Sequence, residues 1–231
     1  MRFLAWIRRF GSVSAAIAIL AGCAGQPPGQ PLGQPMDVAS TAADRRMLVR
    51  PGRSGFVVAA HATGDASTAV IAREIAQHTG FGLVVAPGAS PRDAGQSPAG
   101  AYERAVGEAA QGPLRFFVEI RGSDRTPCAG RMDIATVGVD AELGLRLRAL
   151  AELILDAHLR ANREIERLTV QVEGADGTDL GVSAWPDDIR RRPERALQIE
   201  LPRCPRPDWR EMYGAILGDF VSQAAALPAG R

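Results

Sequence analysis

The chain has 231 residues, 46% of them hydrophobic, and carries 27 basic and 26 acidic side chains for a formal net charge of +1. The first 23 residues contain three arginines and no acidic residue, so the rest of the chain has a charge of −2. Nucleic-acid binding requires a concentrated basic surface, and this balance argues against nucleic acid as a partner.

Residues 1–23 have the pattern of a targeting segment. Arg2, Arg8 and Arg9 precede an apolar stretch over residues 10–20 that is too short to span a bilayer. The segment ends in Leu20-Ala-Gly-Cys23, which resembles the lipobox of bacterial lipoproteins, where cleavage precedes a cysteine that is then acylated, for example with palmitate. We therefore expect Cys23 to carry a lipid anchor. The alternative is an ordinary secretory signal with a free cysteine nearby.

The next segment, residues 24–50, has the composition of a linker. Gly-Gln-Pro begins at residues 25, 29 and 33, a composition that favours extended, polyproline-like conformers and cannot form a core. Ala24 and Gly25 after the cysteine resemble the outer-membrane sorting pattern of Gram-negative lipoproteins. The expected location is the outer membrane, facing the periplasm, with the linker as a spacer.

Residues 51–231 are expected to form one domain, because about 180 residues are enough for one compact core. The expected strands are near-continuous apolar runs, which are typical of strands covered on both faces. They are Gly55–His61, Gly82–Ala86, Leu114–Arg121, Arg131–Val137, Leu168–Val172 and Ala196–Leu201.

Helical patterns fall between these strands. Ser67–Thr79 precedes Gly80, a predicted C′ glycine, and Ala99–Ala110 shows a weaker pattern. Asp140–Asn162 has leucines at helical spacing, and a last helix is predicted after Asp208, which with Glu211 resembles a capping box. The alternating order predicts an α/β fold, a three-layer sandwich with a mostly parallel central sheet.

Polar side chains stand at the carboxyl ends of three of these strands. His61 and Asp65 follow the first, Glu119 and Arg121 close the third, and Glu200 lies near the end of the last. Open α/β sheets place ligand sites at this edge, so we expect these residues to contribute to one site. The alternatives are a hydrogen-bonded core histidine at position 61, a helix-start role for Asp65, and a structural salt bridge between Glu119 and Arg121.

The arrangement resembles the N-formylglutamate amidohydrolase family and, more distantly, the zinc carboxypeptidase clan, over most of residues 55–226. The resemblance implies a phosphorylase/hydrolase-like fold and zinc as the cofactor, with His61 and, less closely matched, Asp65 as metal ligands. It implies that Glu200 is the general base that takes a proton from zinc-bound water. The implied reaction is hydrolysis of an amide bond next to a carboxylate.

The sequence departs from that family at Arg121, where a metal-binding histidine is expected. Arginine is always protonated and offers no lone pair, so it cannot be a zinc ligand. Its guanidinium could instead replace the positive charge of the metal, pairing with carboxylates such as Glu119 or with the carboxylate of an acidic or peptide-like ligand. The sequence therefore leaves open an enzyme with an incomplete metal site, a catalytically lapsed binding protein, and a structural lipoprotein.

The remaining candidates are less specific. Cys128 and Cys204 are either a disulfide pair or two free thiols. His78 and His158 fall in helical patterns and are interpreted as structural. The run Arg190-Arg-Arg192 is interpreted as a solvated face, and the polar loops 87–98 and 174–193 as rims of the site.

Overall fold

The computed structural model describes residues 47–62, 66–87, 100–123, 130–163, 167–175, 180, 193–202 and 210–228. The chain divides into two compact units, Met1–Ser40 and Thr41–Arg231, and all described residues belong to the second. The predicted targeting segment, most of the predicted linker and most of both predicted loops lie outside the described residues. None of the helices that the structure describes is long and apolar enough to cross a membrane.

The described part of the chain alternates strands and helices in nearly the predicted order. The strands are β1 (Leu48–Arg50), β2 (Arg53–Ala62), β3 (Phe81–Pro87), β4 (Phe116–Ser123), β5 (Arg131–Val137), β6 (Thr169–Val172) and β7 (Arg195–Pro202). The helices are α1 (Ala66–Thr79), α2 (Ala101–Ala110), α3 (Ala141–Ala161) and α5 (Arg210–Ala226).

These strands form one mixed sheet of seven strands in the order β1-β3-β2-β4-β7-β5-β6. Pairing is parallel between β3, β2, β4 and β7 and between β5 and β6. It is antiparallel where β1 meets β3 and where β5 meets β7. The predicted α/β fold with a mostly parallel sheet is therefore confirmed.

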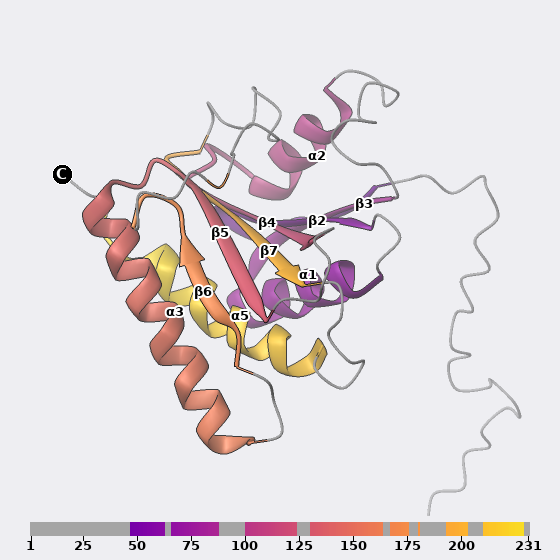
Figure 1. Cartoon of the computed structure of the whole chain (residues 1–231). Coiled ribbons are helices and arrows are strands. Elements are labelled where there is room, and N and C mark those ends of the chain that lie inside the picture. Colours follow the sequence, from indigo (N-terminus) through magenta and orange to yellow (C-terminus); the bar gives the residue numbers. More distant parts are fainter. Residues whose placement is uncertain are drawn as a thin grey trace, which may run out of the picture. The chain divides into compact units, whose positions relative to one another are not determined.

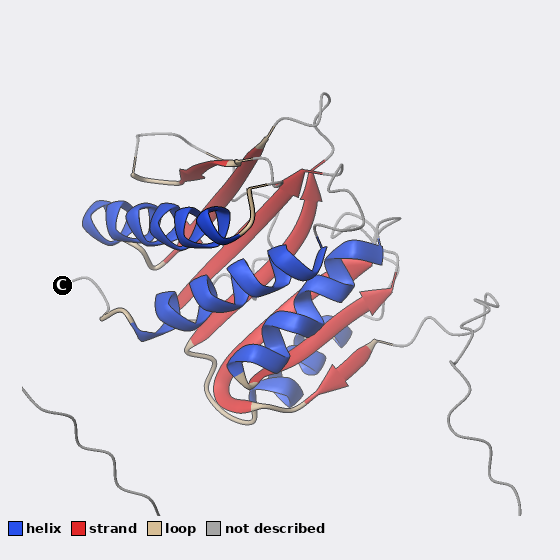
Figure 2. Cartoon of the chain, turned by 90° about the horizontal axis from the view of Figure 1, so that it is seen from below, coloured by secondary structure: helices blue, strands red, loops and turns tan. Residues whose placement is uncertain are grey.

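The sheet separates two layers of helices (Figure 1). Helices α1, α3 and α5 cover one face, as the view from below in Figure 2 shows, and α2 lies on the other. The larger core forms between the sheet and the three-helix layer, and the smaller one between α2 and the strands β2 and β3. The three-layer arrangement predicted from the sequence is present.

Local sequence signals account for several element boundaries. Gly80 ends α1 with φ of 70°, a left-handed conformation that glycine adopts without the steric cost of a side chain. Asp140 begins α3 by accepting a hydrogen bond from the backbone N–H of Leu143 at 2.8 Å. Asp208, the expected cap of the last helix, lies outside the described residues.

The folded domain begins earlier than the boundary at residue 51 that the composition indicates. Strand β1 pairs antiparallel with β3, where Val49 stands opposite Val84. Three residues assigned to the linker thus belong to the sheet. The strand has only three residues and follows a long polar segment, so its sequence gives no clear strand pattern. Only the pairing with β3 reveals it.

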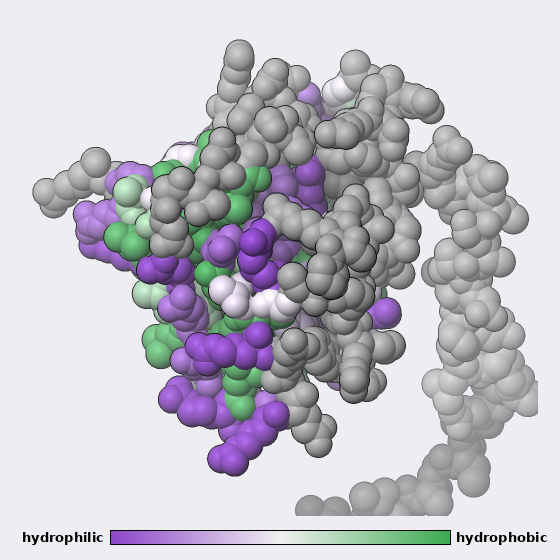
Figure 3. Space-filling model, in the orientation of Figure 1, coloured by the Kyte–Doolittle hydropathy of each residue, from purple (hydrophilic) through white to green (hydrophobic). Residues whose placement is uncertain are grey.

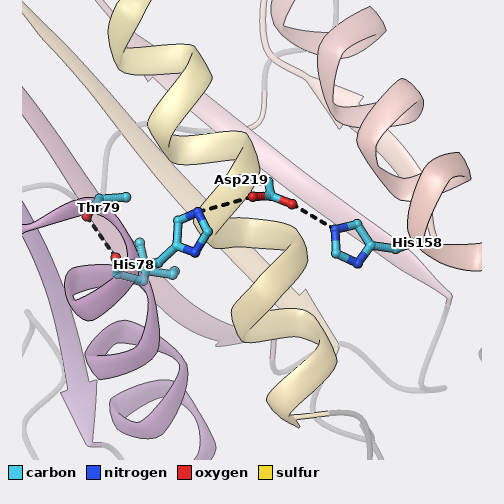
Figure 4. Close-up of polar contacts among 5 residues, drawn as sticks. His78, Thr79, His158 and Asp219 are labelled. Atoms are coloured by element: carbon cyan, nitrogen blue, oxygen red, sulfur yellow. Dashed lines mark hydrogen bonds and ion pairs between the residues drawn. The ribbon is translucent and has the colours of Figure 1, made fainter. Parts of the chain in front are cut away.

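A carboxylate joins the three helices of the larger layer. Asp219 on α5 contacts His78 on α1, with Nε2 3.1 Å from Oδ1, and His158 on α3, with Nε2 2.9 Å from Oδ2 (Figure 4). Gly218 lies beside the His78 ring, where a Cβ would be 3.0 Å from Cγ. Both histidines thus link helices of this layer and lie away from the strand ends discussed below, and their structural role stays a prediction.

Candidate ligand-binding site

Strand alternation places the buried polar residues of the sheet on the face that α2 occupies. In β4, Val118 and Ile120 belong to the core beneath α1 and α5, while Phe117 belongs to the core beneath α2. Glu119 and Arg121 alternate with the first pair and therefore share the face of Phe117. The same alternation assigns Gln198 and Glu200 of β7, and Asp133 of β5, to this face.

The strand register aligns these polar residues in two rows across the sheet. In one row, Glu119 pairs with Gln198, which pairs with Ala135. In the next row, Arg121 pairs with Glu200, which pairs with Asp133. Neighbouring strands lie about 4.8 Å apart, so side chains within a row are in reach of one another. We call these five residues, Glu119, Arg121, Asp133, Gln198 and Glu200, the polar rows.

The centre of the polar rows is a buried ion pair. Arg121 Nε donates to Glu119 Oε2 at 2.9 Å, and the side chains are 16% and 3% exposed. Such complete burial of a carboxylate is costly unless a charge partner and hydrogen bonds compensate for the lost hydration. The salt bridge that the sequence left open as the structural alternative is present, and it uses only one edge of the guanidinium.

Tyr102, in the first turn of α2, supports this ion pair. Its hydroxyl donates to Glu119 Oε1 at 3.5 Å. Burial, and then the negative charge of Glu119, raise the pKa of the Tyr102 phenol well above its ordinary value, although Arg121 acts in the opposite direction. The phenol therefore remains a hydrogen-bond donor, and α2 contributes directly to the orientation of the Glu119 carboxylate.

Apart from Asp133 Oδ1, which lies in the ion pair with Arg131, two buried polar atoms of the rows have no hydrogen-bond partner among the described residues. They are Arg121 Nη2, a donor, and Gln198 Oε1, an acceptor. A buried polar atom without a partner costs about 1–3 kcal/mol, so folded proteins rarely keep one without a reason. Because Gln198 is the register neighbour of Glu119, a ligand with an acceptor oxygen and a nearby N–H could satisfy both atoms.

The outer part of the rows carries further charge. Arg131 engages Asp133 with two nitrogens, Nε 2.8 Å from Oδ1 and Nη2 2.9 Å from Oδ2. Glu200 stands in register between Arg121 and Asp133 and is partly exposed. No ion pair or hydrogen bond joins Glu200 to another residue that the structure describes. Its carboxylate is thus available to accept a proton or an N–H from a ligand.

The described residues do not by themselves fit a zinc site. No group of three or more His, Cys, Asp or Glu side chains within them could hold a metal ion. At the position of the expected histidine, Arg121 brings a positive charge that already binds Glu119. The zinc predicted by resemblance would need ligands outside this set.

The structure brings together three of the predicted site residues, Glu119, Arg121 and Glu200. His61 is placed only through its backbone, in β2 opposite Ala86 and adjacent to β4. Asp65 lies outside the described residues, as do Cys23, Cys128, Cys204 and the Arg190–Arg192 run. The roles predicted for these residues stay predictions.

Sequence reasoning missed three contributors to the site, Tyr102, Asp133 and Gln198. Asp133 and Gln198 interrupt apolar runs in the same way as Glu119 and Glu200, so the same criterion could have identified them. Tyr102 had no such signal. Only the packing of α2 against the sheet brings its hydroxyl to Glu119.

Comparison with known proteins gives similarity at the level of the fold. No protein-family model matches the sequence, and no curated protein sequence matches it. Among solved structures, a bacteriophage poly-gamma-glutamate hydrolase is 13% identical, with a TM-score of 0.48, over 81% of this chain and 91% of that chain. N-formylglutamate amidohydrolase from Ralstonia eutropha is 14% identical, with a TM-score of 0.39, over 79% of this chain and 98% of that one.

A metallo-carboxypeptidase from Burkholderia cenocepacia is 11% identical, with a TM-score of 0.35, over 84% of this chain and 58% of that chain. The structures to which this fold is similar thus include amidohydrolase, hydrolase and carboxypeptidase folds. The narrower assignment to the N-formylglutamate amidohydrolase family stays a prediction.

Proposed function

We propose that the domain binds a small acidic or peptide-like ligand at the polar rows, through a carboxylate of the ligand and an N–H close to it. The observation that carries this proposal is the orientation of Arg121. Its Nε is held by Glu119, while Nη2 is buried without a hydrogen-bond partner in the described part of the chain. A guanidinium fixed on one side and unsatisfied on the other is prepared for a second carboxylate.

The acceptors around Arg121 support the second half of the proposal. Gln198 Oε1 has no hydrogen-bond partner within the described ranges, and the Glu200 carboxylate is the register neighbour of Arg121. The charges of Glu119 and Asp133 are balanced by Arg121 and Arg131, whereas Glu200 has no ion-pair partner among the residues that the structure describes. A simple anion would be repelled by Glu200. An N-acylated amino acid or a peptide end offers both a carboxylate for Arg121 and an N–H for the acceptors.

A binding measurement tests this proposal. The full chain is titrated calorimetrically with N-acylated glutamate, and with the same compound as its methyl ester. We expect binding of the acid and a loss of at least about tenfold in affinity for the ester, which is about 1.4 kcal/mol. Arg121→Lys keeps the charge but removes the planar guanidinium that can bind a carboxylate through two nitrogens. It should weaken binding of the acid by a similar factor. Arg160→Lys, on exposed α3, is the matched control, and equal affinity for acid and ester would contradict the proposal.

A second candidate, a zinc-dependent amide hydrolase, is favoured by the Glu200 carboxylate. This group is partly exposed, lies near the end of β7 and is engaged by no described residue, as a general base requires. Zinc, when bound, would polarise the scissile carbonyl and lower the pKa of a water molecule. His61 and Asp65 would have to hold it together with a ligand other than Arg121.

Metal analysis separates the two candidates. The parent, Glu200→Gln and Arg121→His are loaded with zinc, dialysed and measured for metal content and for release of the acyl group. Stoichiometric zinc in the parent, with turnover lost in Glu200→Gln, would establish the hydrolase and exclude the metal-free binding protein. Binding without turnover, together with zinc retained only by Arg121→His, would establish the binding protein.

We also propose that the protein acts while anchored by lipid in the bacterial outer membrane. The proposal is supported by Leu20-Ala-Gly-Cys23 and by the polyproline-like segment after it. Incorporation of labelled fatty acid by the parent, lost in Cys23→Ala, is the expected result. Equal labelling of both, or recovery of the parent in a soluble fraction, would contradict the anchor.

A further inference from the structure

Helix α3 leaves one side without a partner among the described residues. Its buried side packs against α5 and β6 through residues that include Leu147, Ala151 and Leu155. The opposite side carries Leu145 and Leu153, which are 46% and 63% exposed. Within the described residues, Leu48 on β1 is the other exposed large hydrophobic side chain. Figure 3 shows hydrophobic residues reaching the surface among hydrophilic ones in the region of α3.

The exposed side of α3 has the spacing of a coiled-coil seam. The positions alternate in steps of four and three residues, which keeps them on one line along a helix. We call this line the α3 seam; its members are Glu142, Arg146, Ala149, Leu153, Asp156 and Arg160. The two ends of the seam are charged and its middle is apolar, with Leu145 beside it.

The α3 seam is complementary to itself when a second copy runs antiparallel. With a two-fold axis at the height of Ala151, Glu142 faces Arg160, Arg146 faces Asp156, and Ala149 faces Leu153. Every acidic residue then meets an arginine, and the large apolar side chain meets the small one. A two-fold interface requires this relation, because residue i contacts j wherever j contacts i.

We propose that α3 is the dimer interface of this protein, occupied by the same helix of a second copy in antiparallel orientation. All three pairs of facing residues are complementary when the partner is the same helix. This self-complementarity favours a second copy over an unrelated protein. In the single chain, Arg146 binds Glu142 and Arg167 binds Asp156, each at 2.6 Å, but the four side chains are at least 42% exposed. Exposed ion pairs of this kind contribute little to the stability of the fold, so replacing them with contacts across the interface costs little free energy.

The composition of the α3 seam also determines how the dimer should behave. Its apolar centre consists of Ala149, Leu153 and the flanking Leu145, so association is expected to be weak and reversible. The charged ends set orientation and make association sensitive to salt. Dimerisation would leave the polar rows unobstructed, since α3 lies on the other face of the sheet.

Sedimentation of the full chain tests the dimer, over protein concentrations from about 1 μM to about 1 mM, which span the corresponding range of dissociation constants. We expect a monomer–dimer equilibrium that weakens as salt is raised. Leu153→Glu should weaken it at least about tenfold. Leu48→Glu replaces a comparably exposed leucine outside the seam and should leave the dissociation constant of the dimer unchanged. Circular dichroism confirms that each variant is folded.

Charge reversal provides the decisive comparison. Glu142→Arg and Arg160→Glu should each weaken the dimer by placing like charges opposite one another. The double variant restores both pairs and should recover the parent association. A monomer at every concentration would overturn the proposal and leave the seam to a different partner. A double variant no better than the two single ones would overturn the antiparallel arrangement.

Discussion

The two faces of the central sheet are made from the same strands, but only the face beneath α2 carries the polar rows beside its smaller apolar core. Neighbouring residues of β7 illustrate this, because Ile199 is fully buried in the core beneath the three-helix layer while Gln198 lies in the polar rows. The first face buries apolar area and supplies the stability of the fold. The second retains buried charge and, as far as the described residues go, polar atoms of Arg121 and Gln198 without a hydrogen-bond partner, which is the kind of local conflict that folded proteins keep for function.

The largest expected effect comes from a substitution on the apolar face. Ile199→Ala should lower the free energy of unfolding by about 2–5 kcal/mol, because it removes buried area and leaves a cavity. Gln198→Ala, one residue away, should cost much less, since it removes an acceptor to which no described residue donates a hydrogen bond. Denaturant unfolding of both variants measures the difference. Equal losses would show that the two faces contribute alike to stability.

A smaller loss is expected when the ion pair of the polar rows is broken. Glu119→Gln keeps the shape of the side chain but removes the charge that Arg121 binds, and should cost about 1–3 kcal/mol. It should also free the guanidinium and change ligand affinity. Glu142→Gln, which breaks the exposed pair with Arg146, is the control and should change stability by less than about 0.5 kcal/mol. A cost for Glu119→Gln no greater than for this control would show that the buried pair is not part of the stabilising framework.

The smallest effect concerns the helix layer and depends on pH. Desolvation by burial, and then the charge of Glu211, raise the pKa of Glu74 on α1 above its ordinary value. Its Oε2 is buried and has no hydrogen-bond partner among the residues that the structure covers. A carboxyl group whose pKa is higher in the folded state favours folding while protonated, so this contribution is present at low pH and is lost as pH rises through the folded pKa.

Glu74→Gln imitates the protonated form and should remove this dependence, leaving the variant at least as stable as the parent at neutral pH. Denaturant midpoints measured from about pH 4 to pH 8 compare the two proteins across the range in which a carboxyl with a raised pKa titrates. Glu108→Gln, exposed on α2, is the control. A parallel pH profile for parent and Glu74→Gln would show that Glu74 is not the group responsible.

The sequence by itself determined most of the fold. Near-continuous apolar runs and helical spacing predicted six of the seven strands and all four helices that the structure describes, within a few residues, because each pattern reports burial of a long segment. Strand β1 was missed, because three residues carry too little periodicity and its pairing with β3 is a long-range contact.

The sequence also predicted that Glu119, Arg121 and Glu200 would share one edge of the sheet, because parallel strands bring their carboxyl ends together. Only the tertiary structure decided what these groups do there. The antiparallel placement of β5 beside β7 brings Asp133 to Glu200, and the packing of α2 brings Tyr102 to Glu119. Spacing along the chain fixes which residues approach the sheet edge, whereas strand order and helix packing fix which partner each charge meets.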